Sequence, residues 1–171
     1  CEAALNTYGG RHRGGLGGAE YGSEHNILYL GSGGGSGHPF CNKGAKGGKG
    51  GNGGGSVCVC AMSIIIDGMV LCDGEKGGDA VGSGASGGGG GSGGSIALHS
   101  AQTLKNNGIT RAVGGKGGKK GNEGRCPGIC SDGGAGGVGR IYILAPMVEG
   151  KGTFTPDAYM LPSPCVTIYN R

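Results

Sequence analysis

The chain has 171 residues, and 48 of them are glycine, about four times the usual share. Six tyrosines, two phenylalanines and no tryptophan leave too little apolar volume for a large conventional core. The net charge is only +4, and no apolar run approaches the roughly 20 residues of a membrane-spanning helix, so we expect no membrane insertion.

The first third of the chain alternates glycine segments with one short strand. It begins at Cys1 without the basic and apolar stretches of a signal peptide, so we expect any such peptide to have been removed or to lie outside this piece. Residues 9–22 predict a first glycine segment and residues 26–30 (NILYL) a short strand. Residues 38–41 (HPFC) predict the corner between the next two glycine segments.

A repeated unit follows, in which two strands and a turn lie between glycine tracts. Residues 57–60 alternate in polarity, the β-branched run at residues 64–66 predicts burial on both sides, and the Asp67-Gly68 dipeptide predicts the turn. In the second copy Ser95 takes the place of Ser56, an offset of 39 residues. Strands at residues 140–145 and 152–155 form the third copy. One helical turn is expected near residues 101–106.

The glycine tracts have a period of three residues. The stretch KGAKGGKGGNGGG spaces Lys43, Lys46 and Lys49 three apart, so polar side chains share one edge and glycines occupy the others. This period is typical of polyproline II helices, which pack closely only where the inward positions lack side chains. A flexible linker of the same composition is the alternative. The structural glycines of this hypothesis are Gly44, Gly47, Gly50, Gly53, Gly87, Gly90, Gly93, Gly115 and Gly118.

These patterns together predict an all-β fold. We expect a short-stranded parallel β-helix or solenoid-like stack, combined with packed polyglycine II (polyproline II) helices and stapled by disulfides. Residues 1–155 would form the glycine-rich repeat domain. Residues 156–171, which contain three prolines and the apolar run CVTIY, would form a C-terminal capping or bridging segment.

The cysteine count predicts a disulfide framework, because an even number in a chain with a small core is typical of secreted proteins. We expect at least three disulfides. The Pro-Gly turn in CPGIC favours a pair between Cys126 and Cys130, whereas Cys58 and Cys60 share one strand face and would not pair with each other. The other pairings stay open. The candidates are Cys1, Cys41, Cys58, Cys60, Cys72, Cys126, Cys130 and Cys165.

A zinc site built from these thiols and a histidine is the alternative use of the cysteines. No CxxC pair with the usual ligand spacing occurs, so the sequence assigns no metal. It also contains no P-loop, no Ser-His-Asp arrangement and no paired carboxylates, and we expect neither an enzyme nor a cofactor. The histidines considered for zinc are His12, His25, His38 and His99.

Lysines concentrate in two glycine tracts and predict two basic ridges. The simpler interpretation is a solvated face that keeps the chain soluble, and the alternative is docking onto an anionic polysaccharide, a nucleic acid or an acidic partner. We expect no nucleic-acid partner, because the disulfide hypothesis places the chain outside the cell. The ridge residues are Lys43, Lys46, Lys49, Lys116, Lys119 and Lys120.

The motifs GGRHRGG, EYGSEHN, LGSGGGSG, GGNGGGSV, GGGSGGSIAL and GGAGGVGRIYI follow one another along the chain. This series resembles the glycine-rich β-helical module of large secreted or cell-surface proteins of plants, protists and some bacteria, over about residues 9–145. A looser likeness is to the glycine-rich domains of receptor ectodomains and to glycine-helix antifreeze proteins. The resemblance implies an extracellular structural or adhesive role and carries over no catalytic residue.

We therefore expect a secreted or cell-surface structural protein, a subunit or fragment of a filament, appendage or matrix. Its partners would be further copies of itself or other domains of a larger surface protein. An adhesin-like module, or one that binds carbohydrate or ice, is the alternative. The threonines are scattered and form no flat row, which argues against ice binding.

Overall fold

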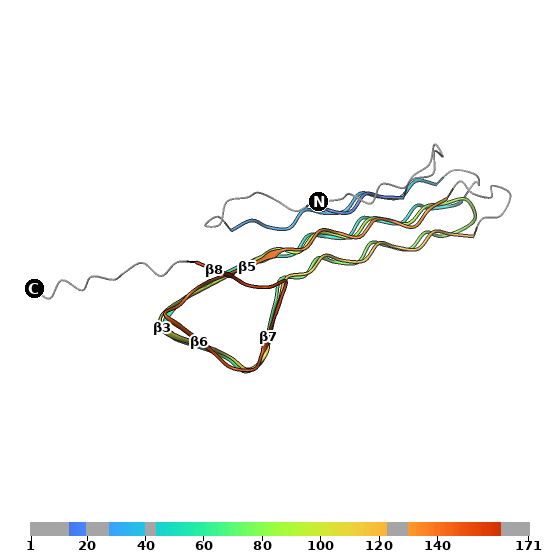
Figure 1. The fold of residues 1–171 in the computed structure, drawn as a ribbon. Helices are drawn as coiled ribbons and strands as arrows, with labels where there is room; N and C mark the ends of the chain where they lie inside the picture. The colour runs from blue at the N-terminus through green and yellow to red at the C-terminus, as the bar shows by residue number, and fades with distance from the viewer. Residues whose placement is uncertain (1–13, 20–27, 40–43, 123–129, 162–171) are drawn as a thin grey trace, which may run out of the picture.

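The computed structural model describes residues 14–19, 28–39, 44–122 and 130–161. Within these residues the fold is all-β and contains no helix. Figure 1 shows its two parts, a triangular stack of strands at one end and a bundle of extended glycine segments that runs away from it. The chain passes repeatedly between the two parts: each layer of strands follows a glycine segment, and the first two layers lead into another one.

The strands stack in three layers, and every strand pair is parallel. The first sheet has the order β1-β3-β5-β8, with β6 also paired to β3, and the second sheet has the order β2-β4-β7. The first layer contains β1 (Ser56–Ile66) and β2 (Met69–Leu71), and the second contains β3 (Ser95–Asn106) and β4 (Ile109–Arg111). The third contains β5 (Arg140–Leu144), β6 (Met147–Glu149) and β7 (Thr153–Thr155), and β8 (Tyr159–Met160) pairs with the outer side of β5.

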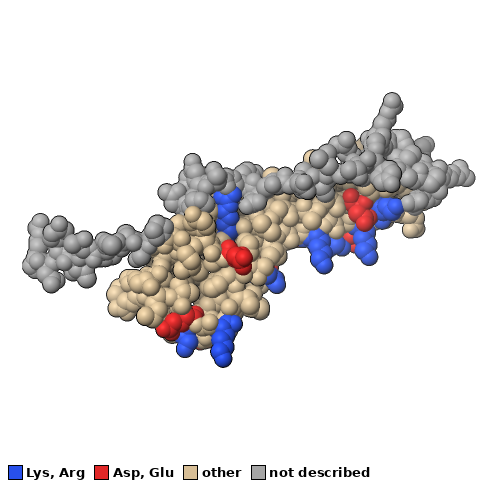
Figure 2. Space-filling view, in the orientation of Figure 1, with Lys and Arg blue, Asp and Glu red and all other residues tan. Residues whose placement is uncertain are grey.

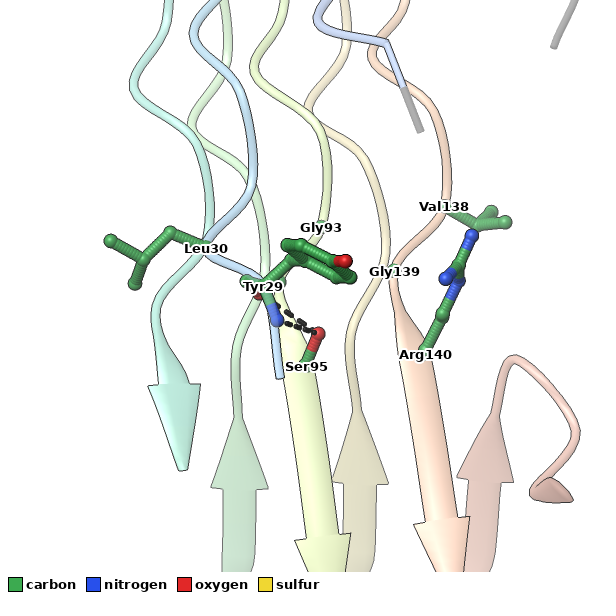
Figure 3. Close-up of a pocket in the computed structure, with 8 residues that line it drawn as sticks. Tyr29, Leu30, Gly93, Ser95, Val138, Gly139 and Arg140 are labelled. Carbon is green, nitrogen blue, oxygen red and sulfur yellow. Dashed lines mark hydrogen bonds between the residues drawn. The ribbon is translucent and has the colours of Figure 1, made fainter. Parts of the chain in front are cut away.

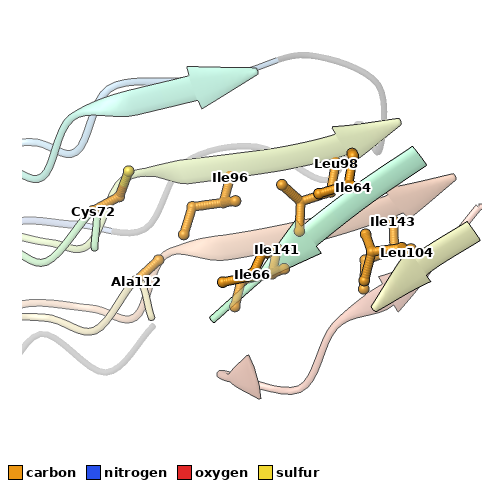
Figure 4. Packing of buried hydrophobic residues seen from close by; sticks show 9 residues of the cluster. All are labelled: Ile64, Ile66, Cys72, Ile96, Leu98, Leu104, Ala112, Ile141 and Ile143. Carbon is orange, nitrogen blue, oxygen red and sulfur yellow. The ribbon is translucent and has the colours of Figure 1, made fainter. Parts of the chain in front are cut away.

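The register of the strands repeats the offset seen in the sequence. Ser56 pairs with Ser95 and Ser95 with Arg140, so equivalent side chains of successive layers lie one above another. Because side chains alternate along a strand, every second residue points into the triangle. These inward rows form the apolar core in Figure 4, which contains Ile64, Ile66, Cys72, Ile96, Leu98, Leu104, Ala112, Ile141 and Ile143.

Three expectations for the strands are corrected. The run at residues 64–66 is not buried on both sides: Ile64 and Ile66 are buried, whereas Ile65 is 66% exposed, as strand alternation requires. Residues 101–106 continue β3 and form no helical turn, because Leu104 pairs with Ile64 in the ladder. Of the strand expected at residues 26–30, residues 28–30 are described and are not in a strand. The apolar run CVTIY lies outside the described residues.

The glycine bundle has a central segment, residues 84–94, that is buried along its whole length. Six other segments surround it and are bonded to it: residues 14–18, 31–38, 44–55, 72–81, 112–122 and 130–139. The segments run side by side along the bundle in Figure 1. The central segment therefore has protein on every side.

Hydrogen bonds in the bundle recur every third residue. From residue 86 to residue 94, successive amides of the central segment donate in turn to the segments at 31–38, 130–139 and 72–81. From residue 85 to residue 92, its carbonyl oxygens accept in turn from the segments at 112–122, 44–55 and 14–18. The polar backbone groups of this buried segment are thus satisfied by its neighbours, as burial demands.

The bundle requires glycine because neighbouring backbone leaves no space for a side chain. A Cβ atom added at Gly90 would overlap the carbonyl oxygen of Gly115, and one added at Gly87 would overlap that of Gly118. Both obstacles are carbonyl oxygens that already accept hydrogen bonds from the amides of Gly136 and Gly133, so they have little freedom to move aside. Where the central segment carries Ser92, its Oγ accepts a 2.7 Å hydrogen bond from the amide of Ser32.

Candidate functional site

The two ends of the strand stack are the surfaces where the fold stops without a covering layer. Among the described residues, no further strand pairs with the outer edges of β1 and β2 at one end, or of β6 and β7 at the other. We call these surfaces the first-layer end and the third-layer end. Open strand edges present backbone N–H and C=O groups that pair readily with another strand.

The apolar rows of the core are exposed where they reach the third-layer end. Leu104 is fully buried, whereas Val148, which pairs with it in the next layer, is 37% exposed. Ile143 is likewise fully buried, and its partner Met160 is 50% exposed. These two side chains occupy core positions of the repeat, and they are exposed because the stack ends there.

The first-layer end is also apolar. Val57 and Val59 belong to the inward rows of β1 and are only partly buried, although their partners Ile96 and Leu98 are fully buried. Other large apolar side chains of this layer are exposed as well. They are Met62, Ile65, Met69 and Leu71.

An ion pair between Arg111 and Asp73 lies at the junction between the stack and the bundle. The Nε and Nη2 atoms of Arg111 donate to Oδ2 of Asp73 at 2.8 and 2.6 Å, and the amide of Val113 donates to Oδ1 at 3.0 Å. Partial burial acts to raise the pKa of Asp73, but these hydrogen bonds and the guanidinium charge outweigh it and lower the pKa below its usual value. The contact joins the first two layers where their chains leave the triangle.

The described cysteines all have free thiols, which corrects the expectation of at least three disulfides. Cys58 and Cys60 are exposed on β1, and Cys72 and Cys130 are buried. Since four of the eight cysteines are free, the other four allow two disulfides at most. Those four, Cys1, Cys41, Cys126 and Cys165, lie outside the described residues.

The predicted pair between Cys126 and Cys130 therefore has one member outside the described residues and one with a free thiol. The Sγ atoms of Cys58 and Cys60 lie 3.8 Å apart and are not bonded to each other. Desolvation and then the neighbouring Cys60 raise the pKa of the Cys58 thiol.

The lysines of the predicted ridges lie on two segments separated by a third that carries acids. Lys46 and Lys49 belong to residues 44–55, and Lys116, Lys119 and Lys120 to residues 112–122; Lys43 is outside the described residues. The segment at 72–81 lies between them and is bonded to both.

On that middle segment Asp79 forms an ion pair with Lys76 at 2.8 Å and accepts a 2.7 Å hydrogen bond from the amide of Lys119. Figure 2 shows blue and red side chains close together on this part of the molecule. A surface of mixed sign fits a solvated face better than a dedicated site for a polyanion.

Of the predicted structural glycines, those in the bundle face neighbouring backbone. An added Cβ atom would overlap the backbone of another segment at every such position except Gly44, which has open space around it and a φ of +100°. Gly44 is therefore suited to a turn of the backbone and not to close packing. The positions with close neighbours are Gly47, Gly50, Gly53, Gly87, Gly90, Gly93, Gly115 and Gly118.

A small pocket lies where the bundle meets the stack (Figure 3), between Tyr29 and Arg140. Ser95 lines its base: its hydroxyl donates to the carbonyl oxygen of Tyr29 at 2.8 Å and accepts from the amide of Tyr29 at 3.2 Å. The volume of about 10 Å³ is room for about one water molecule. The pocket is too small for an organic substrate.

No protein family, curated protein or solved structure matches this chain. The described part of the chain contains no helix of the length and apolar character needed to cross a membrane.

Sequence reasoning missed two groups of residues that the structure brings together. The exposed members of the core rows, Val148 and Met160, were not singled out, although aligning the third copy with the first two places Val148 beside Leu104. The adjacency of Cys60 and His99 was also missed, although the offset of 39 residues that pairs Ser56 with Ser95 pairs these two as well.

Proposed function

We propose that this chain is a structural subunit, or a fragment of one, of an extracellular filament, appendage or matrix. In this proposal a second copy of the chain continues the strand stack. The observation that carries it is the exposure of core positions at the stack ends: Val148 and Met160 are exposed, whereas their partners Leu104 and Ile143 are fully buried. A further layer from another copy would bury them in the same way.

We further propose that the strands are the coils of a short parallel β-helix and that the glycine segments are polyglycine II helices. The three parallel layers and the repeat of hydrogen bonds every third residue support this assignment. So does the backbone: among the described residues only Gly44, Gly82, Gly84 and Gly150 have a positive φ. A left-handed polyproline II helix needs a φ near −75° and gains nothing from the freedom of glycine to adopt positive values.

The mode of assembly follows from the sense of the strands. Each layer pairs in parallel with the next. The first layer of a second copy could therefore pair in the same parallel sense with the third-layer end of the first copy. Contact between two different surfaces is head-to-tail, and such contacts produce open filaments unless the rotation closes a ring. β8 pairs with β5 alone, so it leaves the outer edges of β6 and β7, the third-layer end, without a strand partner among the described residues.

The extracellular setting of the proposal rests on the resemblance to the glycine-rich module of secreted and cell-surface proteins, and on the four cysteines outside the described residues, which allow up to two disulfides. A structural role is supported over a catalytic one by the small size of the pocket beside Ser95. The partner in this proposal is a protein surface, either a second copy or another domain of a larger chain.

The test is sedimentation velocity of the chain over a range of concentrations, for the wild type and two variants. Val148→Lys places a charge in the exposed end of a core row. Thr153→Lys adds the same charge on the outward-facing row of β7, which is exposed in the monomer. We expect the sedimentation coefficients of the wild type and of Thr153→Lys to rise with concentration as the chains associate. The sedimentation coefficient of Val148→Lys should stay closer to that of a monomer.

A wild-type chain that sediments as a monomer at every concentration would contradict the assembly proposal and favour an adhesin-like or carbohydrate-binding module. Equal association of all three proteins would place the contact elsewhere on the surface. Circular dichroism of each variant shows whether the strand content is preserved.

A further inference from the structure

Three potential metal ligands meet on the outer face of the first sheet. Cys58 and Cys60 lie two residues apart on β1, so their side chains share one face, and His99 on β3 pairs directly with Cys60. The two Sγ atoms are 3.8 Å apart, and Nδ1 of His99 is 3.8 Å from Sγ of Cys60. The three atoms all lie within 4.8 Å of one another.

The two 3.8 Å distances are close to those between ligands of a tetrahedral zinc ion, and the third pair of ligand atoms, from Cys58 and His99, lies within 4.8 Å. With Zn–S bonds of about 2.3 Å, two thiolates at a tetrahedral angle have sulfur atoms about 3.8 Å apart. With a Zn–N bond of about 2.0–2.1 Å, the corresponding distance from sulfur to nitrogen is about 3.6 Å. We propose that Cys58, Cys60 and His99 bind one Zn²⁺ ion, with its fourth position open to water or to an added ligand.

A disulfide between the two cysteines is the competing use of these thiols, and the strand geometry opposes it. Residues two apart in a strand are separated by about 6.6 Å between Cα atoms, with their Cβ vectors side by side, whereas a disulfide brings the Cβ atoms to about 3.8 Å. Cys58 is held opposite Ala97 and Cys60 opposite His99 in the ladder with β3. Closing the bond would require β1 to leave that ladder.

The site is both accessible and held in place. Cys58 and Cys60 are exposed, so an ion reaches them without opening the core, and His99 is half-buried. The backbone pairing of β1 with β3 fixes the spacing of the ligands before the ion binds. Binding converts each thiol to a thiolate and releases its proton to solvent, so no oxidant or reductant takes part.

The inference is independent of the proposed assembly, and it is tested on the full chain. The protein is stripped of metal with a chelator under a non-thiol reductant and then titrated with Zn²⁺ against a chromophoric competitor. Variants are Cys58→Ser with Cys60→Ser, and His99→Ala. Matched controls are Ala61→Ser, an exposed residue of the same strand, and His38→Ala, a histidine outside the cluster.

We expect the double serine variant to bind one Zn²⁺ fewer per chain than the wild type. His99→Ala should lower the Zn²⁺ affinity of the same site by at least about 10- to 100-fold. That is the loss seen when a residue that only supports a ligand is removed, and His99 would be a ligand itself. Both controls should bind as the wild type does. Titration with Co²⁺ provides a second readout, since thiolate ligands produce a charge-transfer absorption that the double variant should lose.

Equal zinc stoichiometry and affinity in the wild type and the double serine variant would overturn the proposal, as would a disulfide between Cys58 and Cys60 in the native chain. Because both cysteines are exposed, serine at these positions leaves the core intact. A circular dichroism spectrum identical to that of the wild type confirms that the variant is folded.

Discussion

The amide of Gly90 donates a 2.9 Å hydrogen bond to the carbonyl oxygen of Gly134. The two glycines belong to different segments of the bundle, separated in the chain by the second layer of strands and by a further glycine segment. A side chain at Gly90 has no room in this arrangement, because the carbonyl oxygen of Gly115 occupies the space that a Cβ atom would fill. The glycine content of the chain is therefore a requirement of packing.

Gly90→Ala is expected to destabilise the chain strongly. Ordinary overpacking of a core costs about 1–3 kcal/mol in the free energy of unfolding, and here the obstacle is backbone, so we expect the upper end of that range or beyond. The control is Gly55→Ala, because nothing lies within 4 Å of a Cβ at Gly55, and its effect should stay within about 1 kcal/mol. Thermal or urea unfolding measures both, and equal tolerance would show that the tracts are loosely packed.

Replacing a bundle glycine should also cost more than replacing an exposed lysine of a tract. Gly87→Val introduces branched carbons where the carbonyl oxygen of Gly118 lies, whereas Lys49 is exposed. Lys49→Val is expected to change the free energy of unfolding by no more than about 0.5 kcal/mol. A comparable loss of stability in both variants, measured by urea unfolding, would contradict the inward placement of Gly87.

Leu98→Ala is expected to lower the free energy of unfolding by about 2–5 kcal/mol, as truncation of a fully buried leucine does. Leu98 has no exposed surface and lies in the row between Val59 and Ile143, so the cavity would open between two layers. Ile65→Ala is the control on the same sheet, because Ile65 is largely exposed. Chemical denaturation of the two variants should separate them clearly, and similar values would show that the triangle interior is not the core.

Acid is expected to weaken the junction through Asp73. Its pKa is lowered in the folded chain, so its contribution to stability is complete above the ordinary value of 3.8 and is lost as the pH falls through the lower folded value. Asp73→Asn should therefore be less stable than the wild type at pH 7, and the difference should narrow below about pH 4. Thermal unfolding from pH 7 to pH 3 measures this, with the exposed Asp157→Asn as control. A difference in melting temperature that does not change with pH would contradict it.

Native thiol labelling should divide the described cysteines into two classes. Cys72 is buried, and its burial and then the charge of Asp73 raise its pKa, so it should react slowly with iodoacetamide. Cys58 and Cys60 are exposed and should be modified first in metal-free protein. Peptide mass mapping before and after unfolding gives the rates, and rapid labelling of native Cys72 would contradict its position in the core.

The layered strands were predictable because their pattern is local. Alternation at residues 57–60 and the offset from Ser56 to Ser95 are visible in the sequence, and the ladder follows them. Ile65 was misjudged because a run of three isoleucines does not reveal which of them faces outward. The helical turn expected at residues 101–106 is wrong because the polar residues after Ser100 hide the strand alternation, which becomes clear only when Leu104 is paired with Ile64.

The bundle was predictable only in part. The period of three residues indicated packed helices, but nothing in a uniform glycine tract distinguishes residues 84–94 as the central segment. That position depends on which six segments surround it, and the partners come from all parts of the described chain. The ends of the stack were missed for a related reason: Val148 is a core residue by pattern and exposed only because no layer follows.

The enclosure of residues 84–94 constrains the order of events in folding. Four of the six surrounding segments precede the central one in the chain, and the other two follow it. We expect that during synthesis the first four segments assemble around one side of residues 84–94, and that residues 112–122 and 130–139 then complete the enclosure. Until that closure the central amides that donate to Gly134 and its neighbours remain open to solvent. Afterwards these amides should exchange with solvent deuterium only when the whole bundle opens.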